Sequence, residues 1–196
     1  EETRLIDTTT GQSRRLGGPW LPTTGGMWSR DGRQVICQTQ AAGGQSLFWT
    51  TTVDGTESRP WTVPLDLTKG AVYLANGVTR TWTTDNRVLM RQLEPSGVSF
   101  HLVPATGGVA EKACESRPGQ MLCEAAMTPD GLVRVARDAS AQRLMLLDLG
   151  KLNAPRRLTT GFGSEASPTI SPDGRLVGFA SNPDGKWEMQ VVPVDN

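Results

Sequence analysis

Ser171-Pro172-Asp173-Gly174-Arg175, followed directly by Leu176 to Ser181, is the clearest indication of the fold in this sequence. An Asp-Gly pair tolerates the positive φ of a tight reverse turn, and the mostly apolar run after it is typical of a β-strand. Weaker copies of this stretch recur along the chain, and the four aspartates at this position are Asp31, Asp85, Asp130 and Asp173. Their spacings of 54, 45 and 43 residues indicate a β-propeller or a related repeat array.

Each repeat predicts four short antiparallel strands separated by polar turns, which is the unit of a propeller blade. We expect one all-β propeller region over residues 1–196, with a partial blade at 1–18 and repeats at about 19–62, 63–113, 114–160 and 161–196. About four blades lie near the lower limit of the roughly four to eight that propellers contain. The chain is therefore either a small propeller or, as we favour, part of a larger one. In the second case further blades or a second chain would complete the ring, because exposed blade edges need a partner.

The composition argues against two classes of partner. Twenty Lys and Arg residues balance twenty Asp and Glu residues, so the chain has no overall field that would hold nucleic acid. No apolar run approaches the roughly 18–20 residues that would cross a membrane. The chain begins at Glu1 rather than Met, which suggests a processed or excised piece.

The fourth repeat resembles the blade of TolB-like β-propellers. The resemblance rests on Ser171–Arg175, Phe179–Ser181, Asp184-Gly185 and Trp187–Val191, and it is weakest in the second repeat, where Asn86 replaces the usual Gly. Such repeats also occur in propellers of prolyl-oligopeptidase-type peptidases and in bacterial sensor and regulator proteins. The resemblance implies a propeller that binds a protein or small ligand, or that controls entry to a peptidase, and it implies no catalysis by the propeller itself.

The repeated aspartates could suggest acid–base or metal chemistry, but a structural role explains them better. An Asp before Gly accepts backbone N–H bonds within its own turn, which accounts for one copy per repeat at Asp31, Asp85, Asp130 and Asp173. His101 is the only histidine, so a His-rich metal site is excluded. No Gly-x-Ser-x-Gly nucleophile elbow is present either. We therefore expect no catalytic residues, no metal and no cofactor.

Four residues are candidates for binding. Trp20 lies in a loop beside Pro19, where an exposed aromatic ring would be a contact anchor. Arg80, Glu124 and Glu165 precede the innermost strands, which would place them near one mouth of the central channel. Propellers usually bind ligands there, so we expect a protein partner or small ligand at the channel mouth. For each of the three, ordinary solvated loop charge is the competing interpretation.

Four other tryptophans are expected to be structural. Trp28 and Trp82 share one position in the repeat and should pack between neighbouring blades, whereas Trp49 and Trp187 lie in third strands and should be core residues.

Two cysteines bear on the cellular location. Cys114 and Cys123 bracket a loop with turn residues at its centre, and in an oxidising compartment they would close a disulfide. Two unlinked thiols are the alternative. Together with the family resemblance, the disulfide would favour a periplasmic or extracytoplasmic location.

Two functions remain open from the sequence. The first is a non-catalytic binding module, either TolB-like or the sensor portion of a bacterial regulator. The alternative is the substrate-gating propeller of a prolyl-oligopeptidase-type serine peptidase, which would require a separate hydrolase domain.

Overall fold

The structure, a computed structural model, is built from β-strands alone. It describes residues 4–16, 23–41, 43–74, 82–116, 120, 122–128, 133–139, 141–148, 156–161 and 163–195. Every regular element in these ranges is a strand. Across the same ranges, no helix offers the length and apolar character needed to cross a membrane.

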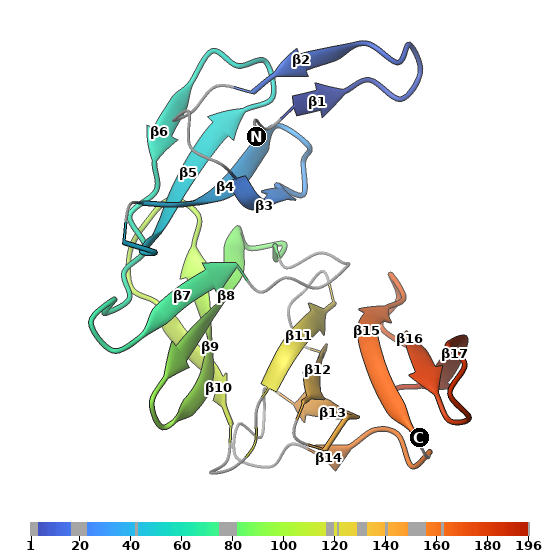
Figure 1. Ribbon diagram of the computed structural model, residues 1–196. Helices are drawn as coiled ribbons and strands as arrows, with labels where there is room; N and C mark the ends of the chain where they lie inside the picture. The colour runs from blue at the N-terminus through green and yellow to red at the C-terminus, as the bar shows by residue number, and fades with distance from the viewer. Residues whose placement is uncertain are drawn as a thin grey trace.

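The strands form a two-stranded N-terminal hairpin and four larger sheets, which are numbered first to fourth along the chain (Figure 1). Within each sheet the strands are antiparallel and follow one another in chain order. The N-terminal hairpin pairs β1 (Arg4–Ile6) with β2 (Ser13–Arg15). The first sheet contains β3 (Thr23–Trp28), β4 (Gln34–Gln40), β5 (Ser46–Thr52) and β6 (Ser58–Pro60). The second contains β7 (Ala71–Leu74), β8 (Arg87–Glu94), β9 (Gly97–Pro104) and β10 (Glu111–Glu115). The third contains β11 (Leu122–Met127), β12 (Val133–Asp138), β13 (Arg143–Asp148) and β14 (Arg156–Arg157). The fourth contains β15 (Ser164–Ile170), β16 (Leu176–Asn182) and β17 (Glu188–Pro193).

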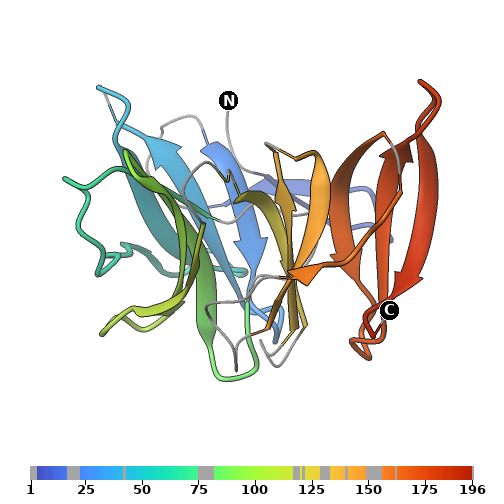
Figure 2. The ribbon, with the colours of Figure 1, turned by 90° about the horizontal axis from the view of Figure 1, so that it is seen from below.

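The sheets follow one another in an arc. Figure 1 shows the N-terminal hairpin at one end of this arc and the fourth sheet at the other, with β3, β11 and β15 toward the centre. Figure 2 shows the first to fourth sheets from below, standing side by side. Three four-stranded sheets and one three-stranded sheet, all antiparallel and arranged around a centre, confirm the predicted all-β propeller of about four blades.

Both faces of an inner strand of the second sheet are buried, because this sheet packs between the first and the third. In β8, Val88 and Met90 join a cluster shared with the first sheet, whereas Leu89 joins a cluster shared with the third. Successive side chains of a strand point to opposite faces, so a strand buried on both sides reads as a continuous apolar run. This explains the uninterrupted Val-Leu-Met sequence at positions 88–90.

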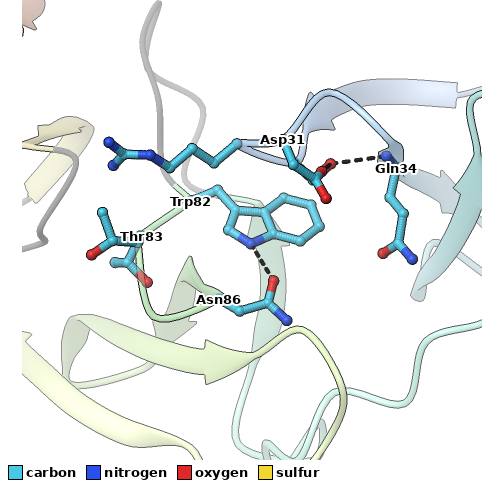
Figure 3. Close-up of a pocket in the computed structure, with 8 residues that line it drawn as sticks. Asp31, Gln34, Trp82, Thr83 and Asn86 are labelled. Atoms are coloured by element: carbon cyan, nitrogen blue, oxygen red, sulfur yellow. Dashed lines mark hydrogen bonds between the residues drawn. The ribbon is translucent and has the colours of Figure 1, made fainter.

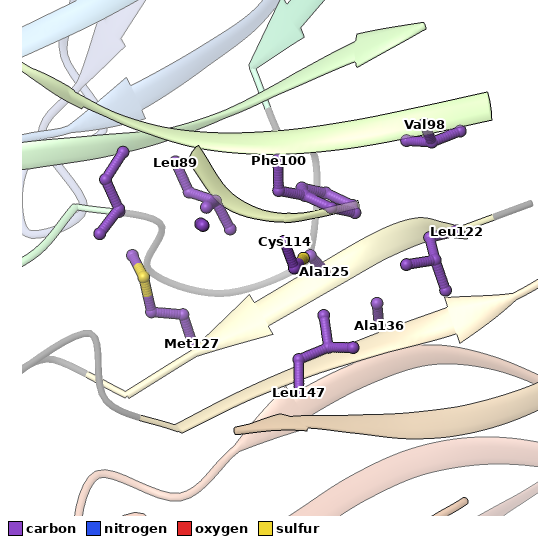
Figure 4. Close-up of a cluster of buried hydrophobic side chains, with 11 residues drawn as sticks. Leu89, Val98, Phe100, Cys114, Leu122, Ala125, Met127, Ala136 and Leu147 are labelled. Atoms are coloured by element: carbon purple, nitrogen blue, oxygen red, sulfur yellow. The ribbon is translucent and has the colours of Figure 1, made fainter. Parts of the chain in front are cut away.

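Three apolar clusters hold the four sheets together. Figure 4 shows the one between the second and third sheets, where Phe100 and Leu89 meet Leu122 and Met127. A second cluster joins the first sheet to the second, and a third joins the third sheet to the fourth. Since burial of one large apolar side chain contributes roughly 1.5–3 kcal/mol, these interfaces are the main source of stability.

Buried amides add polar links between sheets. The Gln38 side chain donates to Ser46 Oγ (3.2 Å) within the first sheet, and its Oε1 accepts the backbone N–H of Leu74 in the second (2.9 Å). Gln92 Nε2 donates to the carbonyl oxygen of Asp66 (2.7 Å), in the segment that connects these two sheets. A buried link of this kind fixes the register of one sheet against the next.

The N-terminal hairpin packs beside the first sheet. Leu5 and Leu16 contact Val35 and Cys37 of β4. This face of the first sheet is therefore covered, as are the faces between the other sheets.

Two of the tryptophan predictions are wrong. Trp82 is buried as expected, but Trp28 is half exposed, at 50%. Trp187 is 55% exposed rather than part of the core, because it lies just before β17, an edge strand of the fourth sheet whose described residues are mostly exposed.

Candidate functional site

A pocket of about 500 Å³ lies between the first and second sheets (Figure 3). It is lined by the turns that lead into the second strand of each sheet, β4 and β8. The turn between β3 and β4 contributes Ser29, Arg30, Asp31 and Gln34. The segment before β8 contributes Trp82, Thr83, Thr84 and Asn86. Volumes of roughly 300–1,000 Å³ are typical of small-ligand sites.

The first wall of the pocket is a turn closed by its own side chains. Asp31 Oδ1 accepts hydrogen bonds from Ser29 Oγ (2.6 Å) and from the backbone N–H of Arg33 (3.0 Å). Ser29 Oγ in turn accepts the backbone N–H of Gln34 (2.8 Å). Gly32 has a φ of 69°, which an L-residue adopts only with strain. The Ser-x-Asp-Gly sequence thus builds a rigid turn from local bonds alone.

The second wall repeats this arrangement. Thr83 Oγ1 donates to Asp85 Oδ1 and accepts the backbone N–H of Arg87 (2.8 Å). Asn86 takes the place of the usual Gly with a φ of 62°, a conformation that Asn tolerates better than most residues. Its Oδ1 also accepts the indole N–H of Trp82 (2.8 Å), as Figure 3 shows. Asn86, which makes the second repeat the weakest match in the sequence, therefore holds the buried indole of Trp82 in place at the pocket.

The fourth sheet contains a third copy of the turn. Asp173 Oδ1 accepts from Ser171 Oγ (2.5 Å) and from the backbone N–H of Arg175 (3.1 Å), and Ser171 Oγ accepts the N–H of Leu176 (2.9 Å). These hydrogen bonds hold the pKa of Asp173 below its ordinary value, and the Ser29 and Thr83 bonds do the same at Asp31 and Asp85. The turn role holds for the three aspartates that the structure describes, while Asp130 lies outside the described residues.

The pocket is suited to hydrogen bonding. It offers hydroxyl, carboxylate, amide and guanidinium groups, together with the indole of Trp82. Its lining contains neither histidine nor cysteine, and the hydroxyls of Ser29 and Thr83 are bonded to the carboxylates of their own turns. Over the described part of the chain, no cluster of three or more His, Cys, Asp or Glu residues could hold a metal ion.

Neither a family model nor a curated protein matches the sequence. Solved structures do match the fold. A putative TolB from Agrobacterium tumefaciens has a TM-score of 0.72 at 20% identity, over 98% of this chain and 65% of its own. An oligogalacturonate lyase from Vibrio parahaemolyticus has a TM-score of 0.73 at 14% identity, over 98% of this chain and 54% of its own. A puromycin hydrolase has a TM-score of 0.66 at 16% identity, over 93% of this chain and 28% of its own.

The chain has the fold of a TolB-like β-propeller. It spans less than two thirds of the length of each of these three structures. Identities of 20% or less establish the fold and leave activity and ligand open.

Within this TolB-like propeller, Glu124 lies on an innermost strand. It sits at a bulge of β11 with a φ of 44°, and Ser167 occupies a bulge of β15 with a φ of 52°. Glu124 Oε2 accepts the backbone N–H of Ser167 (2.6 Å), and its Oε1 lies 3.4 Å from Nη1 of Arg137. The carboxylate therefore joins the third sheet to the fourth at two unusual backbone positions, both of them away from the pocket.

Glu165 does not reach a channel mouth. Its side chain is buried between the third and fourth sheets, at 1% exposure. Its Oε2 accepts the backbone N–H of Leu144 (2.9 Å) and the hydroxyl of Thr159. A carboxylate enclosed in this way stabilises the sheet interface and cannot contact a ligand, so its prediction as a binding residue is corrected. The other two candidates, Trp20 and Arg80, lie outside the described residues.

No disulfide joins Cys114 to Cys123, which corrects that prediction. Cys114 faces the apolar cluster between the second and third sheets. The Cys123 thiol lies 3.9 Å from Nη1 of Arg137 on the next strand. Burial raises the pKa of Cys123, so this thiol is not activated.

His101 is a structural residue. It is buried, and its Nε2 hydrogen-bonds with Ser99 Oγ (2.9 Å). Burial, aided by the charge of Lys112, lowers its pKa. The neutral form is therefore favoured, as expected for a buried imidazole.

Sequence reasoning missed the pocket, although it had identified both turns. Ser29 and Thr83 each stand two residues before the aspartate of their turn. Equivalent turns of consecutive blades lie at the same end of the ring, so their side chains meet. This shared repeat position was the signal that could have revealed the pocket.

The same local chemistry gives a testable titration at Asp54, in the turn after β5. Asp54 Oδ1 accepts from Thr52 Oγ1 (2.5 Å) and from the backbone N–H (3.0 Å) and hydroxyl (2.8 Å) of Thr56. These bonds lower its pKa to about 2. Since the folded pKa lies below the unfolded one, their stabilising effect is complete above about pH 4 and is lost as the pH falls toward 2.

We expect NMR titration of the Asp54 carboxyl carbon to give a midpoint near 2. Thr52→Val removes the strongest of these bonds and should move the midpoint back toward the ordinary value of 3.8. A wild-type midpoint already near that value would contradict the geometry of this turn.

Proposed function

We propose that this chain is a non-catalytic binding module whose ligand site is the pocket formed by the Ser29–Gln34 and Trp82–Asn86 turns. The observation that carries the proposal is the pocket itself, an open hollow of ligand size that two turns of adjacent sheets line. Rigid turns lose little conformational freedom on binding, which favours recognition.

The chemistry of the pocket favours a polar ligand, such as a short peptide segment of a partner protein. A peptide carries both hydrogen-bond donors and acceptors along its backbone. The pocket offers the Arg30 guanidinium as a donor and the Asn86 amide and Asp31 carboxylate as further polar groups. Because the chain has no net charge, we do not propose nucleic acid as the ligand.

We propose no reaction at this site. A nucleophilic hydroxyl needs an adjacent general base, and histidine serves this role most often. The lining provides none, and the low pKa values of Asp31 and Asp85 make these carboxylates weak bases. Their hydrogen bonds serve the turns.

We also propose that the binding module is TolB-like or is the sensor portion of a regulator. For its location, we propose an extracytoplasmic compartment. The similarity to the Agrobacterium TolB fold supports the location. The unlinked cysteines lend it no support. Fractionation of the source cells with an antibody to this chain would test it, and recovery in the cytoplasm would contradict it.

A substrate-gating propeller of a peptidase is the second candidate. The match of 93% of this chain to 28% of a puromycin hydrolase supports it, because the remainder of that protein provides room for a further domain. A hydrolase domain with a Gly-x-Ser-x-Gly elbow, encoded in the same gene, would favour this alternative over a sensor.

The binding proposal is tested by NMR chemical-shift perturbation. The ¹⁵N-labelled chain is titrated with a pool of synthetic tetra- to octapeptides and, separately, with trigalacturonate. We expect the peptide pool to shift the amides of residues 29–34 and 82–86, and expect Arg30→Ala to weaken these shifts severalfold. Arg175→Ala serves as the matched control, because Arg175 lies in the equivalent turn of the fourth sheet, outside the pocket. Shifts elsewhere, or with trigalacturonate alone, would overturn the peptide-binding proposal.

A further inference from the structure

The pocket between the first and second sheets contains a carboxylate whose charge is unpaired. Asp31 lines this pocket (Figure 3), and none of the ion pairs among the described residues involves it. The equivalent residue of the second turn differs in both respects, because Asp85 is not part of the lining and its Oδ2 lies 2.7 Å from Nε of Arg87. Of these two turn carboxylates, only Asp31 therefore presents an unpaired negative charge to the pocket.

One oxygen of the Asp31 carboxylate is used by the turn, and the other is available. A carboxylate oxygen has about two acceptor sites. Oδ1 accepts the hydroxyl of Ser29 and the backbone N–H of Arg33, so its two sites are filled. Both hydrogen bonds also hold the pKa of Asp31 below its ordinary value, so the carboxylate is charged at neutral pH. Oδ2 is therefore a charged acceptor that the turn does not use.

The other polar groups of the described lining are weaker acceptors or are already used. The indole N–H of Trp82 is bonded to Asn86, and the Thr83 hydroxyl is bonded within its own turn. Arg30 is the cation of this lining, and it already has an interaction partner within the chain. Hydrogen bonds to a charged acceptor are stronger than those to a neutral one, so Asp31 Oδ2 is the strongest acceptor that the pocket offers.

On the basis of the proposed peptide-binding function, we propose that the pocket selects peptides that carry a primary ammonium group, which donates to Asp31 Oδ2. A guanidinium fork matches a carboxylate best when both oxygens are free, whereas an ammonium is a compact point charge that a single oxygen can accept. A lysine side chain and a free amino terminus both supply this group. The Arg30 guanidinium then donates to the backbone carbonyl oxygens of the same peptide.

The expected preference is modest, because Asp31 is exposed. Ion pairs between exposed groups contribute little, so the ammonium should tighten binding about two- to fivefold over a neutral group of the same shape. Added salt should reduce this preference, because salt screens exposed charges.

The test is NMR titration of the ¹⁵N-labelled chain with acetylated glycine pentapeptide amides whose central residue is lysine, norleucine, arginine or glutamate. We expect the lysine peptide to bind about two- to fivefold more tightly than the norleucine peptide. The arginine peptide should gain less, and the glutamate peptide should gain nothing. The norleucine peptide without its acetyl group shows whether an amino terminus serves as well as a lysine side chain.

Two variants assign the preference to one carboxylate. Asp31→Asn keeps the Oδ1 acceptor of the turn and removes the charge, so the lysine and norleucine peptides should then bind equally. Asp173→Asn is the matched control, because Asp173 makes the same bonds in the fourth sheet, outside the pocket. It should leave the preference unchanged. The amide spectrum of each variant shows whether it is folded.

The outcomes separate this selectivity from peptide binding itself. Ammonium-bearing and neutral peptides that shift the amides of residues 29–34 and 82–86 with equal affinity overturn the selectivity and leave the binding function in place. A preference that survives in Asp31→Asn, or a preference for the glutamate peptide, also overturns it. Peptides that shift none of these amides overturn both the selectivity and the binding function.

Discussion

Replacing Glu165 by alanine should destabilise the fold by about 2–4 kcal/mol, one of the two largest effects expected for a single substitution in this chain. The carboxylate is buried and accepts the backbone N–H of Leu144 and the hydroxyl of Thr159. Without it, both donors are left in an apolar surrounding with neither an acceptor nor water. Urea unfolding followed by far-UV circular dichroism would measure the loss.

Two variants show whether the lost hydrogen bonds are the cause. Glu165→Gln keeps one acceptor oxygen and the side-chain volume, so it should cost less, about 1–2 kcal/mol. Glu188→Ala removes an exposed carboxylate from β17 and should change stability by no more than about 0.5 kcal/mol. A Glu165→Ala variant as stable as the Glu188→Ala variant would contradict the role assigned to Glu165.

Gly163→Ala should have an effect of similar size, about 2–5 kcal/mol, for a different reason. Gly163 has a φ of 92°, and a Cβ atom there would lie 2.1 Å from the carbonyl oxygen of Asn182. Because the obstacle is backbone rather than a movable side chain, β16 or the chain before β15 would have to shift. Differential scanning calorimetry would detect the loss as a lower melting temperature.

Gly185→Ala is the matched control for this substitution. Gly185 has a similar φ of 82°, but no atom lies within 4 Å of the position its Cβ would take. It should therefore cost only the conformational strain, about 1–2 kcal/mol. Equal costs for the two variants would show that the close approach to Asn182 is relieved without strain.

The fold could be predicted from the sequence because its turns are local. The bonds that close the turns at Asp31 and Asp173 join residues two to five positions apart, so each turn is encoded in a few consecutive letters. Repetition of that short pattern at a nearly constant spacing then indicates the propeller. No other property of the chain was needed for the fold class.

The surroundings of single side chains could not be predicted in this way. The bond from Leu144 to Glu165 spans 21 residues, and the bond from Ser167 to Glu124 spans 43. These contacts depend on how neighbouring sheets pack, which the repeat pattern does not describe. The same reasoning explains Trp187, whose position in a third strand suggested the core although the terminal sheet leaves it exposed.

The pocket falls between these two cases. Its two walls are local turns that can be recognised in the sequence. The pocket also needs Asn86 and Trp82 of the second turn to lie beside the first turn, and the sequence pattern alone does not show this. A Gly at position 86 would have kept the turn and lost the hydrogen bond to the indole. Asn86, at a position where the other repeats have Gly, is therefore the feature that distinguishes this pair of blades from the others.

The row of sheet interfaces also determines how the molecule opens. Among the described residues, the second and third sheets each bury two faces, whereas the fourth buries only the face against the third. In an array whose stability is a sum over nearest neighbours, releasing a terminal unit breaks one interface and releasing an inner unit breaks two. Amide hydrogens of β16 and β17 should therefore exchange through partial opening of the end of the array, at a lower free energy than those of β8 and β12.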